Sequence, residues 1–250
     1  MSIDSPIVQD NAKTSIVNRM SMHIDARERS LVVSFSEYVR SCSWAVIGGG
    51  FTDIRRVAWF EVHNAELPPE VSPRNYTESR MYASGITDAT IMLTSRCVAS
   101  YADHVVSHGN MQARCLATVG LGNALRAGDP PGVPCRVGTI NLLIHIGKAL
   151  SDEAMLEASS IATEAKVAAI MESKVKSRWS GLTATGTGTD CIVVTCPRTG
   201  QREELEPYAG KHTIVGSAVG ESVYRSVEKG VKDWLSENRV SNSSSRSHGC

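Results

Sequence analysis

The chain has 250 residues, of which 42% are hydrophobic and 21% charged, and its 26 basic residues are balanced by 26 acidic ones. This composition predicts an ordinary soluble protein that is long enough to bury a substantial core. Balanced charge argues against a nucleic-acid-binding surface, which usually has a basic excess. No apolar run approaches the ~18–20 residues that cross a bilayer, so a membrane partner is also not expected.

Residues 1–25 are predicted to form a flexible leader. The segment Met1 to Asn18 is polar and lacks the basic start and apolar stretch of a signal peptide, which predicts a cytoplasmic protein. The seven cysteines are scattered without a C-x-x-C pair, so we expect reduced thiols rather than disulfides. The sequence leaves the oligomeric state open, and a homo-oligomer is possible.

Short apolar runs in the first half of the chain predict strands. A long polar connection is expected over residues 64–80, which contain Pro68, Pro69 and Pro73. The expected strands are Leu31 to Phe35, Trp44 to Ile47, Val57 to Val62, Ile91 to Thr94 and Cys115 to Leu121.

A loop rich in glycine and proline follows at residues 122–131, and a strand follows the loop. The loop carries Asn123, Arg126 and Asp129 within a few residues. In the segment 138–146, Thr139 and Asn141 share one face with Leu143 and His145, whereas the other face is wholly apolar. This alternation fits polar groups aimed at a ligand and also polar groups facing water.

Two helices are predicted in the second half. Ser151 is an N-cap candidate for an alanine-rich helix that reaches about Lys174. A second, amphipathic helix is expected from about Ser217 to Glu237. We therefore predict one α/β (or α+β) domain over residues 26–237, with these long helices packed on a mixed β-sheet, and a disordered tail over residues 238–250.

The most informative segment is a row of threonines and glycines that ends on a carboxylate, just before the apolar run Cys191 to Thr195. If this row is extended, its three hydroxyls point to one side and the glycines leave the other side bare. Glycine weakens a strand unless a ligand or another backbone must come close. The row therefore predicts a site, although an ordinary turn is an alternative. Its members are Thr185, Gly186, Thr187, Gly188, Thr189 and Asp190.

Several familiar sites do not fit the sequence. No lysine follows Gly188 as a P-loop requires, and Leu125 occupies the third glycine position of a dinucleotide-binding fingerprint. His104 and His108 have a spacing that holds zinc on a helix, but the glutamate of the zincin motif is missing, with Val105 in its place. We expect no protein-bound metal.

Taken in order, six blocks resemble the adenosylcobinamide amidohydrolase family, over about residues 30–235. Each block alone is weak, but their order is specific. The blocks are Trp44-Ala-Val-Ile-Gly-Gly-Gly50, Thr118-Val-Gly-Leu-Gly-Asn-Ala-Leu-Arg-Ala-Gly-Asp129, Gly138-Thr-Ile-Asn141, Ala162-Thr-Glu-Ala-Lys166, Ala184-Thr-Gly-Thr-Gly-Thr-Asp190 and Tyr208-Ala-Gly-Lys-His-Thr213.

The resemblance implies that the protein cleaves one amide of adenosylcobinamide and releases adenosylcobyric acid and 1-aminopropan-2-ol, for cobinamide or cobamide salvage. No cofactor is implied, because the cobalt belongs to the corrinoid substrate. An amidase needs a nucleophile, a proton donor for the leaving amine and donors to the oxyanion. Asp190 or Glu164 are candidates for a base toward water, His212 for the acid, and Lys166 for a base if it is buried.

The expected substrate-binding residues are the polar side chains of these blocks: Asn123, Arg126, Asp129, Thr139, Asn141, Thr185, Thr187 and Thr189. Direct attack by a threonine hydroxyl is an alternative to attack by water. A corrinoid-binding delivery protein and an amidohydrolase that acts on another amide are the alternative functions.

Overall fold

The structure is a computed structural model that describes residues 20–132, 138–199 and 204–244. Its main strands are β1 (Met22–Arg27), β2 (Ser30–Ser43), β3 (Gly50–Glu61), β4 (Ala89–Thr94), β5 (Ala102–His108), β6 (Met111–Val119), β8 (Ile140–Ile146) and β10 (Cys191–Pro197). A separate short ladder joins β7 (Ala124–Leu125) to β9 (Gly186–Thr187). The α-helices are α1 (Pro73–Ser84), α2 (Asp152–Glu172) and α3 (Ile214–Ser244), and 3-10 turns occur at Asn64–Glu66 and Val98–Ser100.

The large sheet is mixed. Its strand order is β4-β3-β2-β10-β8-β6-β5, with β1 paired to β2 beside this path. The pairs β3–β4 and β8–β10 are parallel, whereas the other pairs are antiparallel. The predicted fold class, a mixed sheet with helices packed on it, is therefore confirmed. Among the described residues no helix is both long enough and apolar enough to span a bilayer.

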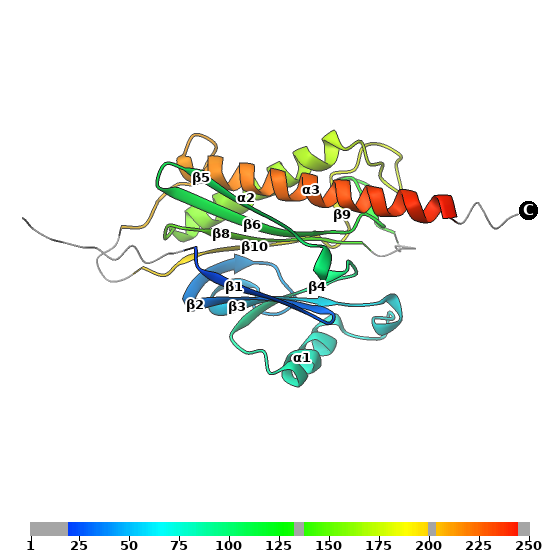
Figure 1. The fold of residues 1–250 in the computed structure, drawn as a ribbon, viewed down its shortest axis with the longest axis horizontal. Coiled ribbons are helices and arrows are strands. Elements are labelled where there is room, and N and C mark those ends of the chain that lie inside the picture. Colours follow the sequence, from blue (N-terminus) through cyan, green and yellow to red (C-terminus); the bar gives the residue numbers. More distant parts are fainter. Residues whose placement is uncertain (1–19, 133–137, 200–203, 245–250) are drawn as a thin grey trace, which may run out of the picture.

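The sheet folds over itself along strand β2. The register of β2 against β3 shifts between Ser34 and Val39, and such an irregularity bends a strand. Before the shift β2 pairs with β1, and after it β2 pairs with β10. Figure 1 shows the result as two layers, with β1 to β4 below and β5, β6, β8 and β10 above.

Helices α2 and α3 cover the outer face of the upper layer (Figure 1). Small residues on α2, including Ala154, Ala158 and Ala162, are fully buried and allow a close approach to the strands and to α3. Ser151 caps α2 by accepting a hydrogen bond from the Ala154 amide at 3.1 Å. The alanine-rich helix of the sequence prediction is therefore present.

A second core lies between the two layers. Leu31 and Trp59 of the lower layer pack there with Leu143 of β8. His145 of β8 is buried on the same face, where its ring lies 5.0 Å from that of Phe35. The partly polar face of β8 is thus turned into the protein and not to water.

Helix α1 corrects the prediction of a long polar connection over residues 64–80. Ser72 accepts a hydrogen bond from the Asn75 amide, and Pro73 occupies the first turn. Proline suits this position because its fixed φ is helical and the amide it lacks has no partner inside the helix. The proline that indicated a loop is therefore part of a helix start.

Three further predictions differ from the structure. Trp44 to Ile47 is not a strand, because only Ile47 forms a single bridge, to Ile91. Strand β1 begins at Met22, inside the predicted leader, and α3 continues to Ser244, inside the predicted tail. Residues 1–19 and 245–250 lie outside the described residues, so those parts of the leader and tail stay predictions.

Candidate functional site

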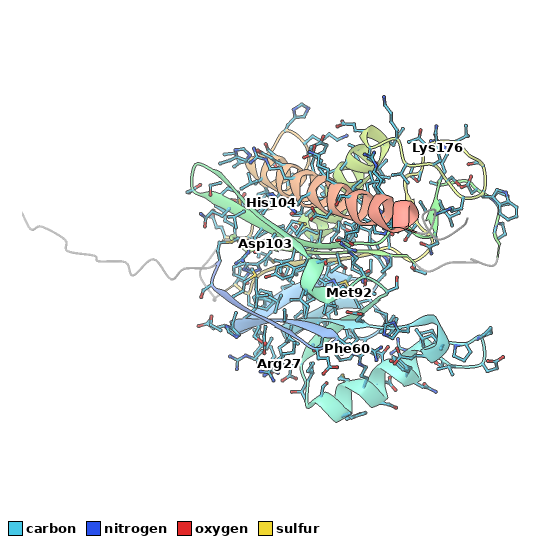
Figure 2. All side chains as sticks on the ribbon, turned by 45° about the vertical axis from the view of Figure 1, so that its right-hand side comes forward. Arg27, Phe60, Met92, Asp103, His104 and Lys176 are labelled. Carbon is cyan, nitrogen blue, oxygen red and sulfur yellow. The ribbon has the colours of Figure 1, made fainter. Side chains whose placement is uncertain are left out.

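A cavity of about 370 Å³ opens at the end of the molecule where β8 and β10 begin. It lies between the two layers of the sheet. Figure 2 shows Met92 of β4, one of the lining residues, at the junction of these layers. The apolar part of the lining comes mainly from the lower layer, and the polar part comes largely from loops of the upper layer. The polar side chains are Thr94, Ser95, Asn123, Thr139, Asn141, Thr189 and Asp190.

Asp190 provides the one charged side chain among the described residues that line the cavity. Its Oδ2 lies 2.5 Å from Nζ of Lys166, which extends from α2, and each side chain is only 9% exposed. The cavity-lining Asp190 is therefore one partner of a buried ion pair. Such a pair is stable only when its geometry is good and the remaining lone pairs are satisfied.

Backbone amides and a hydroxyl satisfy the remaining hydrogen-bonding capacity of the Asp190 carboxylate. Oδ1 accepts from the Ile140 amide at 3.1 Å and from the Thr187 hydroxyl at 2.5 Å, and the Thr187 amide lies within 3.2 Å of both oxygens. A Cβ added at Gly186 would overlap this carboxylate and approach Lys166 Nζ to 3.1 Å. Gly186 therefore permits the ion pair to lie against the backbone.

The three threonines of the Thr/Gly row do not present a common face. Only Gly186–Thr187 is strand, and the chain turns directly afterwards. The Thr185 hydroxyl accepts from the Ala127 amide, whereas the Thr187 hydroxyl donates to Asp190. Thr189 faces the cavity and donates to the Gly138 carbonyl. The expected extended row is corrected to a turn built around Asp190, because the carboxylate attracts Thr187 inward.

Thr139, directly before β8, and Asn141 on β8 line the cavity, and both are almost fully buried. The Thr139 hydroxyl donates to the Thr189 carbonyl at 2.9 Å, and Asn141 Nδ2 donates to the Leu93 carbonyl at 2.7 Å. Asn141 thus joins the upper layer to β4 of the lower layer. Both predicted binding residues lie at the cavity.

Asn123 also lines the cavity, and its buried Oδ1 has no hydrogen-bond partner among the residues that the structure describes. A Cβ on Gly138 would come within 2.6 Å of this oxygen and within 2.7 Å of the Gly122 amide. Glycine at 138 therefore allows the segments 120–123 and 138–141 to pack closely. The unpartnered carbonyl leaves Asn123 with hydrogen-bonding capacity beside the cavity.

Arg126, Asp129 and Thr185 do not line the cavity. Arg126 donates to the Thr183 carbonyl at 2.8 Å, and Asp129 accepts from the Ser177 hydroxyl at 2.5 Å. The Ser177 hydrogen bond is the main cause that lowers the pKa of Asp129. These predicted binding residues instead tie the loop after β7 to the segment before β9.

Glu164 and His212 lie away from the cavity as well. Glu164 forms an ion pair with Lys211 on the outside of α2, where both side chains are more than half exposed. His212 is exposed in the loop before α3. That helix starts beside the hairpin between β5 and β6, as the contact between Ser217 and His108 shows, at the opposite end of β8. The structure therefore separates Glu164 and His212 from Asp190 and Lys166, the other two predicted catalytic residues, which contact each other.

The structure also locates a cysteine at the cavity and the two histidines that have a metal-binding spacing in the sequence. Cys191 lines the cavity, but burial raises the pKa of its thiol to about 12, so it is protonated at neutral pH. His104 and His108 lie on strand β5, where residues four apart are separated by about 13 Å; Figure 2 shows His104 beside α3. The described residues contain no cluster of three or more metal-ligating side chains.

Sequence reasoning did not find the lower wall of the cavity. Leu67 and Pro73 lie in the segment that was predicted as a connection, Thr94 is the last residue of β4, and Ser95 follows it. Trp44 belongs to the first block of the resemblance, and its indole Nε1 donates to the Asp190 carbonyl at 2.8 Å. No pattern within these short segments indicates that they meet Asp190, because the contact depends on the folding of the sheet over itself.

The family model and two curated relatives carry the same family name. The model of the adenosylcobinamide amidohydrolase family matches residues 13–239. A protein of Methanosarcina mazei with that name is 27% identical over 74% of this chain and 87% of its own length. A second, from Halobacterium salinarum, is 32% identical over 62% of this chain and 65% of its own length.

Solved structures are more distant. A β-aminopeptidase of Burkholderia sp. aligns over 84% of this chain and 79% of that chain, with 13% identity and a TM-score of 0.42. A TM-score this low supports no inference about the chemistry of this chain. The family model, in contrast, covers most of the sequence and includes all six blocks of the resemblance. The chain belongs to the adenosylcobinamide amidohydrolase family.

Proposed function

We propose that this protein hydrolyses the amide that links aminopropanol to the corrinoid of adenosylcobinamide. The products are adenosylcobyric acid and 1-aminopropan-2-ol, which a cell can use again for cobinamide or cobamide salvage. The observation that carries the proposal is a buried, lysine-paired carboxylate in the wall of a cavity, in a chain of the amidohydrolase family.

The reaction requires a base, because water is a weak nucleophile toward an amide. Water gives a proton to the base as its oxygen bonds to the carbonyl carbon. The C–N bond of the tetrahedral intermediate then breaks, and the proton passes to the leaving amine. The corrinoid keeps the new carboxylate.

Asp190 is our candidate for this base, because it is the carboxylate that the described cavity wall provides. Its oxygens are occupied by Lys166, Ile140 and Thr187 in the structure. The Thr187 hydroxyl is the donor that can rotate away and allow water to approach. Lys166 is a positioning residue in this scheme, since it does not line the cavity.

The direct test is incubation of the purified protein with adenosylcobinamide, with the products separated by chromatography and identified by mass. Adenosylcobyric acid and free aminopropanol in equal amounts support the proposal. Binding without cleavage supports a delivery protein, and absence of binding supports an amidohydrolase that acts on another amide.

The same assay with Thr139→Ala distinguishes the nucleophile. Attack by water predicts that this variant keeps turnover with a changed KM, because Thr139 lines the cavity, and that the wild-type protein forms no covalent intermediate. Attack by the Thr139 hydroxyl predicts loss of turnover, together with an ester on Thr139 in the wild-type protein that hydroxylamine can cleave. The outcome bears on the mechanism and leaves the identity of the reaction unchanged.

A further inference from the structure

Trp44 both lines the cavity and presents surface to solvent. The residue is 55% exposed. The single polar atom of its side chain, Nε1, is already bonded to the Asp190 carbonyl. The exposed part is therefore apolar ring surface in a fixed orientation, next to the cavity opening.

The size of the cavity limits what it can hold. At about 370 Å³ it lies at the lower end of the range for pockets that bind drug-sized molecules, about 300–1,000 Å³. A corrinoid with its amide side chains and adenosyl ligand is much larger than such a molecule. The macrocycle must then remain outside while one of its arms enters.

We propose that Trp44 is a platform for the corrinoid macrocycle outside the cavity, and that the cavity receives only the arm with the scissile amide. This inference rests on the proposed function. The preorganised indole suits a broad ring system, because flat apolar surfaces pack on aromatic faces without new ordering of the protein. Thr139, Asn141 and Asp190 would then contact the arm, and Trp44 would contact the ring.

A platform outside the reacting centre binds substrate, transition state and product equally. Loss of such uniform binding raises KM and leaves kcat unchanged. We expect Trp44→Ala to raise KM for adenosylcobinamide about tenfold, with kcat preserved. Adenosylcobyric acid keeps the ring but lacks the aminopropanol. Its inhibition constant against the Trp44→Ala variant should therefore rise by the same factor.

Two variants separate the platform from other roles. Trp44→Phe removes the bond to the Asp190 carbonyl but keeps an aromatic ring. Because the ring is the proposed platform, the KM of this variant should stay near that of the wild type. Trp179→Ala is a matched control, because Trp179 is 59% exposed and does not line the cavity. If Trp44→Ala does not fold, Trp44→Leu removes the ring and retains an apolar side chain.

The outcomes are distinct. An unchanged KM in Trp44→Ala, or an equal rise in Trp179→Ala, overturns the platform while the proposed reaction stands. A fall in kcat without a change in KM in both Trp44 variants also overturns it, since Trp44 would then act through its bond to Asp190. If the wild-type protein neither binds nor cleaves adenosylcobinamide, the proposed function fails and the platform fails with it.

Discussion

Lys166 and Glu164 lie two residues apart on α2 and have opposite surroundings. Lys166 pairs with Asp190 in a buried contact beside the cavity, whereas Glu164 pairs with Lys211 where both side chains are largely exposed. Residues two apart project from different sides of a helix. Loss of one partner of a buried ion pair strongly destabilises the folded protein, whereas an exposed ion pair contributes only about 0–1 kcal/mol to its stability. The comparison shows why the same sequence block contains one residue at the site and one outside it.

Asp190→Asn is expected to have the largest effect on both turnover and stability. The substitution removes the proposed base and leaves Lys166 buried without its counter-ion. We expect turnover to fall by about 10²–10⁴-fold, and the free energy of unfolding to fall by about 3–5 kcal/mol. Steady-state kinetics and urea unfolding measure the two effects separately. Full turnover in this variant would remove Asp190 from the mechanism.

A smaller effect is expected from Gly186→Ala, because the new Cβ overlaps the Asp190 carboxylate. The unfolding free energy should fall by about 1–3 kcal/mol, as in other overpacked interiors. Gly188→Ala is the matched control, since its Cβ would meet Leu125 and Asn123 at 3.5 and 3.7 Å, which are ordinary contacts. An equal fall of the unfolding free energy in both variants would contradict the inference that Gly186 is required by the Asp190–Lys166 ion pair.

Glu164→Gln and His212→Ala should have little effect. Both residues are exposed and lie away from the cavity, so the unfolding free energy should change by less than about 0.5 kcal/mol. Turnover should stay within about twofold of the wild-type value. A large loss of turnover in either variant would show that the exposed pair or the histidine loop contributes to catalysis after all.

Arg29 and Glu66 form an ion pair whose side chains are of intermediate exposure. The contribution of this pair to the free energy of unfolding should depend on pH. The Arg29 hydrogen bond, followed by that of the His63 amide, lowers the pKa of Glu66 from 4.5 to about 2. A lowered folded-state pKa stabilises the protein above the ordinary pKa, and this stabilisation is lost as pH falls toward the folded value. Urea unfolding of the wild type and Glu66→Gln should therefore differ at pH 7 and converge near pH 2. A difference that is constant with pH would contradict this pairing.

Much of the fold was predictable because the signals were local. The spacing of buried alanines and the Ser151 cap indicate α2, and apolar runs indicate β8 and β10. Pro73 was misleading because proline is common both in loops and at the first turn of a helix. Strands β1 and β5 were missed, since their partly exposed residues lack a clear apolar run.

For the site, the sequence by itself determined the reactive residue types and the segment around Asp190. Only the tertiary structure decided which of them meet. Lys166 reaches Asp190, Asn141 reaches β4, and Trp44 reaches the turn of Thr189 and Asp190, whereas Glu164 and His212 are directed elsewhere. Periodicity reports which face of an element is apolar, but it does not report which faces oppose one another once the sheet folds over itself at β2.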